Sequence, residues 1–485
     1  MTTLVWFRRD LRIADNPALA AAARDGAVIP LYIFAPEEDA PWRPGAASRW
    51  WLHQSLGALD QDLRRLGSRL IVRHAQDSLS ELLAIARDTG ATRILWNRLY
   101  EPATVARDRL IKATLRGSGI GAESFNASLL REPWEIANQA GKPFQVFTAF
   151  WRHCLALPDP PEPQPAPALL PAPAKWPPSL QISQLELPPR IDWAASMRAE
   201  WSPGERAATA QLDTFLGEAF EAYAQQRNRP DRTGTSRLSP HLHFGEIGPR
   251  QIWHATQDHA RAPHLGAAWR DSQFLAELGW REFGHHLLHH FPRTAHEPLR
   301  ERFEAFPWRR SADELRAWQR GRTGYPIVDA GMRELWKTGW MHNRVRMITA
   351  SFLIKDLLQP WQDGAAWFWD TLVDADLAAN TLGWQWVAGC GADAAPYFRI
   401  FNPSTQGRKF DPDGAYIRRF LPELERMPSE WIHEPWRAPA AVRQAAGLKI
   451  DADYPAPIVD HGQARERALR ALAVVTESGK KRPPG

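Results

Sequence analysis

The sequence predicts an α/β domain built on a parallel sheet, followed by an all-helical domain. The first 130 residues alternate short apolar runs with amphipathic stretches, which is the pattern of strands and helices in turn. From about Ser202 onward this pattern is lost, and long segments with a period of 3.6 residues follow. Twelve prolines and few charges lie between residues 158 and 189, a composition typical of an extended connector.

The N-terminal elements can be placed in order. We expect strands at residues 3–7, 27–34, 69–73, 93–96 and 121–126, and helices at 16–24, 46–66, 78–88 and 104–115. This alternation implies a Rossmann-like parallel sheet that binds ligands at the carboxyl ends of its strands. Gly117, Gly119 and Gly121 follow a helix and precede a strand. A phosphate-binding turn has the reverse order, so we expect a plain turn and no nicotinamide site.

We place the boundaries where the composition changes. Residues 1–130 form the α/β domain, 131–201 an interdomain linker with its proline-rich part at 158–189, 202–475 the helical domain, and 476–485 a basic tail. In the helical domain the periodicity predicts helices at residues 205–224, 268–291, 311–319, 329–337 and 340–358.

Composition and charge exclude several classes of protein. With 485 residues, 44% of them apolar and 24% charged, the chain should fold as a multidomain globular protein. Cys154 and Cys390 are its only cysteines, which excludes a disulfide framework and a thiolate-rich metal site. The charged N-terminal stretch does not resemble a signal peptide, so we expect a cytoplasmic protein that does not span a membrane. The net charge of +5 permits a polyanionic partner without requiring one.

The first cluster of polar residues in the helical domain follows Gly234. Thr235, Ser236, Arg237, Leu238 and Ser239 combine three hydroxyls with a guanidinium, which suits the binding of a phosphate or pyrophosphate. The alternative is that the hydroxyls cap the helix that follows.

The second cluster places Glu277, Trp280 and Arg281 within about one helical turn. A carboxylate and a flat apolar surface could therefore share one face of a helix, although Glu277 and Arg281 also have the spacing of an ordinary ion pair. The group His285, His286, His289 and His290 lacks the acidic partner of a zinc motif. We expect it to be a surface or interface cluster and not a metal site.

The third cluster spans residues 340–410. Helical spacing puts Asn343, Arg346 and Met347 on one side. Asp374, Asp376 and Asn380 follow without a metal-ligand pattern, so they suit hydrogen bonding to a heteroaromatic ring and a sugar-like chain. Aromatic and basic residues alternate from position 397 to 410, as stacking on bases together with phosphate contact would require.

These clusters resemble the photolyase/cryptochrome family over nearly the whole chain. The resemblance is carried by residues 5–12 and by the segments TGYPIVDAGMRELWKTGWMHNR (323–344), DADLAANTLGWQW (374–386) and DAAPYFRIFNPSTQGRKF (393–410). It implies an all-α FAD-binding domain behind the α/β domain. Matched position by position, it implies that FAD is bound by Tyr223, Thr235, Ser236, Arg237, Leu238, Ser239, Phe274, Glu277, Arg281, Asn343, Arg346, Asp374, Asp376 and Asn380. Asn380 would face the flavin N5, and Arg346 would pair with Asp374 beside the ring.

The resemblance further implies light-driven cleavage of cyclobutane pyrimidine dimers in UV-damaged DNA, by electron transfer from excited reduced FAD to a dimer flipped out of the duplex. It assigns Trp280 and Trp386 to the wall of the dimer pocket, Met347 to a contact with the dimer, and Glu277 and Asn343 to hydrogen bonds with the pyrimidines. The residues implied for the flanking DNA backbone are Arg227, Arg344, Arg399 and Gln406. The residues implied for catalysis and electron supply are Glu277, Asn380, Trp308, Trp361 and Trp384.

Four alternatives remain. A cryptochrome photoreceptor usually has aspartate or cysteine at position 380 and a longer tail, whereas this chain has Asn380. A (6-4) photolyase has a histidine pair near positions 343 and 347, whereas this chain has Asn343 and Met347. A nucleic-acid-binding module would need neither the acids nor the tryptophans, and a nicotinamide oxidoreductase lacks its glycine motif. We expect a monomer with an antenna chromophore. Methenyltetrahydrofolate is favoured over a deazaflavin, although Ala103 and Thr104 replace an asparagine–glutamate pair of some folate-binding members.

Overall fold

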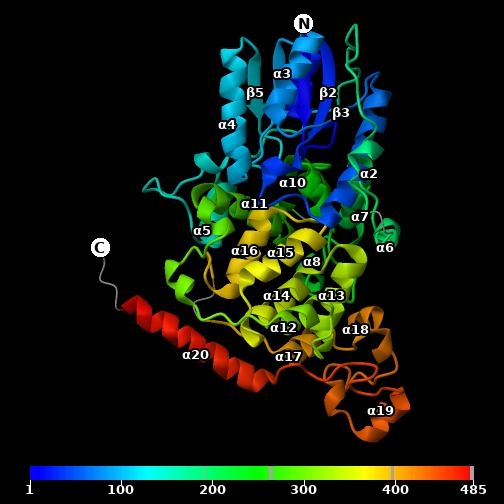
Figure 1. Ribbon diagram of the computed structural model, residues 1–485, viewed down its shortest axis with the longest axis vertical. Helices are drawn as coiled ribbons and strands as arrows, with labels where there is room; N and C mark the ends of the chain where they lie inside the picture. Colours follow the sequence, from blue (N-terminus) through cyan, green and yellow to red (C-terminus); the bar gives the residue numbers. More distant parts are fainter. Residues whose placement is uncertain (190–191, 262–265, 395–397, 481–485) are drawn as a thin grey trace. The chain divides into compact units, whose positions relative to one another are not determined.

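The computed structural model describes residues 1–189, 192–261, 266–394 and 398–480. The chain divides into two compact units (Figure 1). Unit 1 comprises Met1–Glu221, Ser236–Pro292 and Val373–Ala378, and unit 2 comprises Ala222–Thr235, Arg293–Leu372 and Ala379–Gly485. Each unit is described by itself below.

A five-stranded parallel sheet lies at the N-terminal end of unit 1, as predicted (Figure 1). Its order is β3-β2-β1-β4-β5, with strands β1 (Thr2–Phe7), β2 (Ala27–Phe34), β3 (Ile71–His74), β4 (Arg93–Asn97) and β5 (Gly121–Phe125). The connecting helices are α1 (Pro17–Asp25), α2 (Ala46–Arg65), α3 (Ser78–Thr89) and α4 (Pro102–Gly117). The central strands β1, β2 and β4 are buried on both faces, as the continuous apolar run of β2 requires. Gly119, at φ 75°, forms the expected plain turn between α4 and β5.

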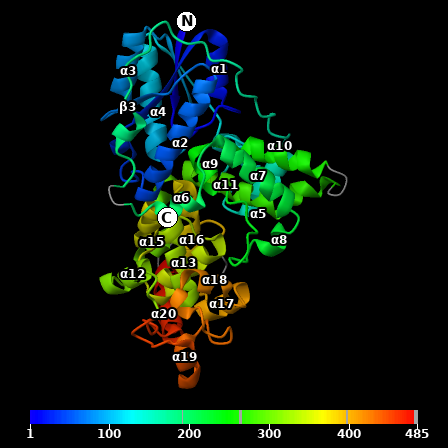
Figure 2. The same cartoon turned by 90° about the vertical axis from the view of Figure 1, so that its right-hand side faces the viewer.

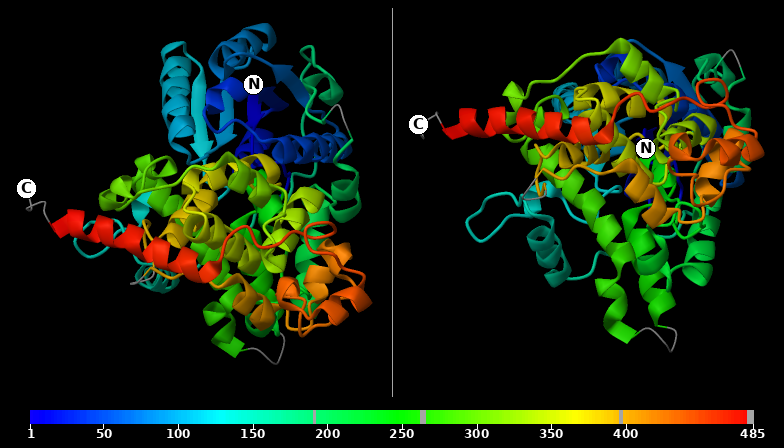
Figure 3. Two further views of the ribbon diagram at one scale, coloured as in Figure 1. Left: turned by 60° about the horizontal axis from the view of Figure 1, so that its bottom comes forward. Right: turned by 90° about the horizontal axis from the view of Figure 1, so that it is seen from below.

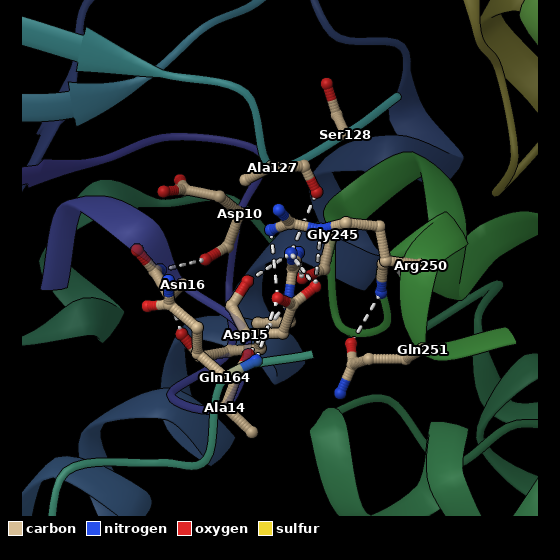
Figure 4. Close-up of polar contacts among 12 residues, drawn as sticks. Asp10, Ala14, Asp15, Asn16, Ala127, Ser128, Gln164, Gly245, Arg250 and Gln251 are labelled. Atoms are coloured by element: carbon tan, nitrogen blue, oxygen red, sulfur yellow. Dashed lines mark hydrogen bonds and ion pairs between the residues drawn. The ribbon is translucent and has the colours of Figure 1, made fainter. Parts of the chain in front are cut away.

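The segment after β1 is fixed by a buried arginine. Arg12 is 1% exposed and donates hydrogen bonds to the carbonyls of Gly245, Asp15 and Ala127 at 2.9, 2.7 and 2.8 Å. Arg250 pairs with the Asp15 carboxylate at 2.9 Å, and Figure 4 shows how these groups converge. A buried guanidinium is tolerated only when its donors are satisfied, so the network joins the sheet to the helical part of unit 1.

The described residues of the predicted linker pack as part of unit 1. The linker contains α5 (Phe147–Ala156), a 3-10 turn η3 (Ile182–Leu185) and α6 (Ala195–Glu200). Its proline-rich part is extended, as expected, and Figure 2 shows it as a trace beside the α/β layer. The amide of Leu180 donates to the Val72 carbonyl of edge strand β3 at 3.0 Å, and the amide of Val28 donates to Pro171 at 2.8 Å. These bonds hold the stretch against the α/β layer.

The remaining helices of unit 1 are α7 (Glu205–Glu218), α9 (Ser239–Phe244), α10 (Pro249–Ala260), the 3-10 turn η4 (Gly266–Asp271) and α11 (Gln273–His290). Two predicted helices are shorter than expected. The segment 205–224 is broken after Glu218, and a separate short helix α8 (Tyr223–Gln226) begins unit 2. The segment 268–291 becomes α-helical only at Gln273, because the Ser272 hydroxyl accepts a hydrogen bond from the Leu275 amide and caps the helix there.

Unit 2 is helical, as predicted. Its main helices are α12 (Ala312–Gln319), α13 (Pro326–Thr338), α14 (Asn343–Ser351), α15 (Trp361–Thr371), α16 (Leu377–Ala388, whose first two residues belong to unit 1), α17 (Pro403–Phe410), α18 (Ala415–Phe420), α19 (Ala440–Ala446) and α20 (His461–Lys480). The predicted helix 340–358 begins only at Asn343, and a π-helical turn η7 (Phe352–Asp356) follows α14. Both views of Figure 3 show α20 as one long helix. None of the helices described has the length and apolarity needed to cross a membrane.

Candidate functional site

The predicted site residues are divided between the two units. Unit 1 carries Ser236, Arg237, Leu238, Ser239, Phe274, Glu277, Trp280, Arg281, Asp374 and Asp376. Unit 2 carries Tyr223, Arg227, Thr235, Trp308, Asn343, Arg344, Arg346, Met347, Trp361, Asn380, Trp384, Trp386, Arg399 and Gln406. Tyr397, part of the predicted aromatic and basic segment, lies outside the described residues.

The predicted phosphate-binding turn at 235–239 leads directly into helix α9, which starts at Ser239 with Leu238 at its N-cap. Leu238 is apolar, so the N-cap residue itself makes no side-chain capping bond. Arg237 has a φ of 54°, a conformation that costs a non-glycine residue free energy and marks many ligand-binding turns. Its guanidinium lies 4.1 Å above the Trp201 ring and pairs with Glu200 at 2.5 Å.

Helix α11 places the second predicted cluster in unit 1. Glu277 accepts a hydrogen bond from the Gln273 amide at 3.0 Å, and Arg281 donates to the Ser128 carbonyl at 2.6 Å. Glu277, Trp280 and Arg281 are all half-buried. This face of the helix therefore combines a carboxylate, an indole and a guanidinium within reach of solvent or a ligand.

One face of the Trp280 ring is covered by a residue that the sequence did not single out. Phe147 of α5 stacks on Trp280 with a centroid distance of 3.8 Å and an interplanar angle of 8°. Phe147 is buried, and it also contacts Phe283 edge-on at 6.0 Å. The stacked phenyl ring fixes the plane of the indole, because offset stacking favours parallel rings. Phe274, predicted as a flavin contact, is buried against Phe215 at 4.5 Å.

The acidic residues before α16 differ in their surroundings. Asp374 is buried. Asp376 lies near two imidazoles, with His285 at 3.6 Å and His243 at 3.8 Å from its Oδ2. Burial alone would raise the pKa of Asp376, but His285, His243 and Arg281 outweigh it and hold that pKa well below its ordinary value. Unit 1 therefore keeps a buried carboxylate ionised at neutral pH.

The histidine group, expected to be a surface or interface cluster, does not lie at the surface but is packed within unit 1. His285 and His286 are buried, and His289 and His290 are half-buried. His285 donates to the Arg281 carbonyl at 3.1 Å, and His286 accepts from the Phe144 amide at 3.0 Å. Burial lowers the pKa of His286 to about 4. These side chains pack α11, and no group of metal-binding side chains occurs among the described residues.

In unit 2, α14 presents the third cluster. Asn343 is exposed, while Arg344, Arg346 and Met347 are half-buried. Arg344 stacks over Phe410 at 4.6 Å and donates from Nε and one terminal nitrogen to the Asn228 amide oxygen, at 3.1 and 2.7 Å. Its other terminal nitrogen is 3.6 Å from the Met347 sulfur. Asn228 was not predicted, and its hydrogen bonds orient the Arg344 guanidinium, one of the implied DNA-binding groups.

Other predicted residues of unit 2 also have defined surroundings. The Arg227 guanidinium lies 5.9 Å from the ring of buried Tyr223. Arg346 donates to the Met341 carbonyl at 2.7 Å. Asn380 donates to the Ala365 carbonyl at 3.1 Å, which fixes its side chain relative to α15. An amide held in this way can present its oxygen in a fixed direction.

The predicted electron-transfer tryptophans lie in unit 2 at different depths. Trp384 and Trp361 are each 2% exposed, and Trp308 is half-buried beside Phe306 at 4.4 Å. Gly364 of α15 allows the close approach of Trp384, since a Cβ atom there would lie 2.1 Å from the indole. Trp384 also contacts Phe368 at 5.0 Å and Trp318, which was not predicted, at 6.3 Å.

The last predicted residues are Trp386 in α16, Arg399 in the segment before α17, and Gln406 in α17. Arg399 is exposed, and Trp386 and Gln406 are half-buried. The Arg399 carbonyl accepts a hydrogen bond from buried Lys355 at 2.7 Å. Lys355 was not predicted as a site residue, although a lysine inside the apolar run SFLIKDLL (351–358) indicates an unusual environment.

Two family models match the chain. One, described as "DNA photolyase", matches residues 3–169, and the other, "FAD binding domain of DNA photolyase", matches residues 274–474. The chain is 48% identical to a deoxyribodipyrimidine photo-lyase of Agrobacterium fabrum, over 98% of each sequence. The crystal structure of a class III photolyase from Agrobacterium tumefaciens is similar at a TM-score of 0.94 and 48% identity, covering 98% of both chains. Cryptochrome-1 of Arabidopsis thaliana is 44% identical over 97% of this chain and 70% of that protein.

Proposed function

Because this chain belongs to the photolyase/cryptochrome family, we propose that it is a photolyase that splits cyclobutane pyrimidine dimers in DNA under blue light. The observation that carries the proposal is the face of α11 on which Glu277 and Trp280 lie less than one turn apart. The indole is backed by Phe147, so its other face is free of that ring and can stack on a flat base. The neighbouring carboxylate can accept hydrogen bonds from pyrimidine N–H groups.

FAD is the cofactor that the residues suit. We propose that it is bound by Tyr223, Thr235, Ser236, Arg237, Leu238, Ser239, Phe274, Glu277, Arg281, Asn343, Arg346, Asp374, Asp376 and Asn380. The turn at 235–239, with three hydroxyls and Arg237, suits the pyrophosphate, and the ionised Asp376 suits a hydrogen-bond donor of the cofactor. When bound in its reduced form, FAD supplies the electron that light drives onto the dimer.

The protein's own part in the reaction is binding and orientation. We propose that Trp280 and Trp386 stack on the flipped dimer, with Met347 against it. Glu277 and Asn343 hydrogen-bond to the pyrimidine edges, and in its protonated form Glu277 can donate a hydrogen bond toward the negative charge that develops on the dimer. The residues proposed to bind the flanking phosphates are Arg227, Arg344, Arg399 and Gln406.

Trp384, Trp361 and Trp308 are proposed as the residues that supply electrons to the flavin from solvent. Trp384 and Trp361 are almost completely buried, while Trp308 is half-buried. Electrons from solvent would therefore enter at Trp308 and pass to the two buried tryptophans. Residues 1–130 are proposed as the antenna domain, with methenyltetrahydrofolate favoured over a deazaflavin, and residues 202–475 as the catalytic domain. We also propose that the enzyme acts as a monomer in the cytoplasm.

Illumination of a defined substrate tests this function. The purified, chemically reduced protein is mixed with an oligonucleotide that contains one thymine dimer, and absorbance at 260 nm is followed in blue light and in the dark. Splitting the dimer restores the 5,6 double bonds, so absorbance should rise in the light alone. A protein that binds FAD but leaves the absorbance unchanged would return the interpretation to a cryptochrome-type photoreceptor.

A further inference from the structure

A lysine without an assigned role lies next to the segment that carries Arg399. Lys355 belongs to the π-helical turn η7 and is 2% exposed. Its Nζ donates to the Arg399 carbonyl at 2.7 Å and lies 3.8 Å from the centroid of the Phe398 ring. The ammonium group thus contacts two successive residues of one segment, through a charge-assisted hydrogen bond and a cation–π contact.

The same segment is held at a second point from the same side. The Phe401 amide donates to the Ser351 hydroxyl at 3.3 Å, and Ser351 is the last residue of α14, directly before η7. On the other side, Gly389 has a φ of 80°, and a Cβ atom there would lie 3.4 Å from the Phe398 ring. The continuous α14–η7 helix therefore fixes residues 398–401, and π-helical turns of this kind are frequent at functional sites.

Lys355 also lies beside one of the proposed dimer-stacking residues. Lys355, Trp386, Phe398 and Arg399 line one small hollow in unit 2. The position of Arg399 relative to Trp386 is thus set by the contacts around one buried ammonium group.

We propose that Lys355 is a positioning residue for DNA binding, which holds the Arg399 segment beside Trp386 so that both are ready for the lesion and its flanking phosphate. This role rests on the proposed function, because it assigns Arg399 and Trp386 to damaged DNA. Lys355 itself is too deeply buried to reach the nucleic acid. It acts through the segment that it holds.

The charge of Lys355 is sensitive to pH near neutrality. Burial lowers the pKa of Lys355 to about 7, and the carboxylate of Asp356 opposes this shift. Cys390 stays a neutral thiol, since burial raises its pKa to about 12. From α20, His461 pairs with the Asp356 carboxylate at 2.6 Å and Arg467 donates to the Asp356 carbonyl. Because the folded pKa lies below the ordinary value of 10.5, the ammonium contacts are present below about pH 7 and are lost as the pH rises through it.

Amide hydrogen exchange tests the positioning role without DNA. In the FAD-loaded full chain, Lys355→Met removes the charge and the hydrogen bond while keeping a long apolar side chain. Exchange in peptides that cover residues 398–402 should become at least about tenfold faster than in the wild type. The hydrogen bond from Lys355 to the Arg399 carbonyl is lost, and the hydrogen bond from the Phe401 amide to Ser351 loosens as a result. In the wild type, exchange there, corrected for the intrinsic rate, should also rise between pH 6 and pH 8.5. Unchanged protection in both comparisons would overturn the proposal.

Binding of a dimer-containing oligonucleotide tests the consequence. Lys355→Met should weaken binding about tenfold, as expected for the loss of a charge-assisted contact that orders a binding segment. Lys355→Arg keeps a charge at every pH and should remove the pH dependence seen in the wild type. In a double-mutant cycle, Lys355→Met should add little to Arg399→Ala, because the first acts through the second.

The two proposals fail in different ways. Fully additive effects of Lys355→Met and Arg399→Ala, or a Lys355→Met variant that binds as the wild type does, would refute the positioning role. A wild-type protein that binds damaged and undamaged DNA equally would instead refute the proposed function, and the exchange experiment would still decide whether Lys355 holds the segment. The flavin absorption spectrum of each variant confirms that it is folded and loaded.

Discussion

Phe147 offers a sharp test of the stacking site, because it contacts Trp280 without belonging to any predicted motif. Its ring lies parallel to the indole at 3.8 Å. Phe147→Leu keeps an apolar side chain of similar volume but removes the flat surface that fixes the indole plane. An aromatic pair contributes about 0.5–1.5 kcal/mol beyond simple burial. If that contribution serves to preorganise Trp280, its loss should weaken binding of a dimer-containing oligonucleotide by about 2- to 12-fold.

The assay is fluorescence anisotropy with dimer-containing and undamaged oligonucleotides of the same sequence. Phe150→Leu is the matched control, because Phe150 lies on the same helix and packs on Phe283 and His286 at 5.2 and 5.1 Å. The control should lose at least as much stability and leave the dimer affinity nearly unchanged. Trp280→Ala sets the upper limit for the loss of dimer affinity, since a base stacked on an aromatic ring contributes about 1–3 kcal/mol to binding. Equal affinities in Phe147→Leu and the wild type, or equal losses in Phe147→Leu and Phe150→Leu, would refute the reasoning.

Four further predictions concern electron supply, catalysis, DNA binding and stability. Trp384→Phe should abolish photoreduction of oxidised flavin yet leave repair by pre-reduced enzyme intact; photoreduction at the wild-type rate, followed by flavin absorbance, would contradict the assigned path. Glu277→Ala should lower the number of dimers repaired per absorbed photon more than it lowers the flavin content, with Glu277→Gln intermediate if hydrogen bonding dominates. The affinity for damaged DNA should fall as salt rises, and Arg399→Ala should reduce the slope of log K against log salt by about one; a flat profile would exclude phosphate contacts. Burial raises the pKa of Asp411 from 3.8 to about 6, although hydrogen bonds from the amides of Tyr416 and Ile417 oppose this rise. Between pH 3.8 and about pH 6 the folded state therefore binds more protons than the unfolded state. The free energy of unfolding should decrease as the pH rises across this window. Asp411→Asn should flatten this dependence in urea unfolding, and an identical dependence in both proteins would show that another group causes it.

The sequence predicted the α/β layer best, because its central strands are buried on both faces and its helices carry local signals. The strand at residues 27–34 was predicted with its observed limits, and the helix predicted at 16–24 begins one residue later because Asn16 caps it by accepting from the Leu19 amide. The helical domain was predicted in type but not in its boundaries. Ser272 and His342 start α11 and α14 later than the periodicity alone suggested, since each accepts a hydrogen bond from a backbone amide of the first turn.

The residues that the sequence analysis missed are those defined by contacts between distant segments. Phe147 lies in the predicted linker, and only the folded chain brings it onto Trp280. Asn228 resembles any polar residue of a loop until Arg344 is seen to donate to it twice. The histidines of α11 were expected at a surface or an interface because polar residues usually lie there. His285 and His286 are buried because α11 is packed on most of its faces, where His286 accepts from the Phe144 amide.

The most direct test of the central claim compares two lesions in one experiment. The reduced protein is illuminated with an oligonucleotide that carries a cyclobutane thymine dimer and, separately, with one that carries a (6-4) photoproduct, and the products are separated by chromatography. The account predicts complete conversion of the cyclobutane dimer to two thymines in the light, none in the dark, and no conversion of the (6-4) photoproduct. Repair of the (6-4) photoproduct alone, or of neither lesion, would contradict it.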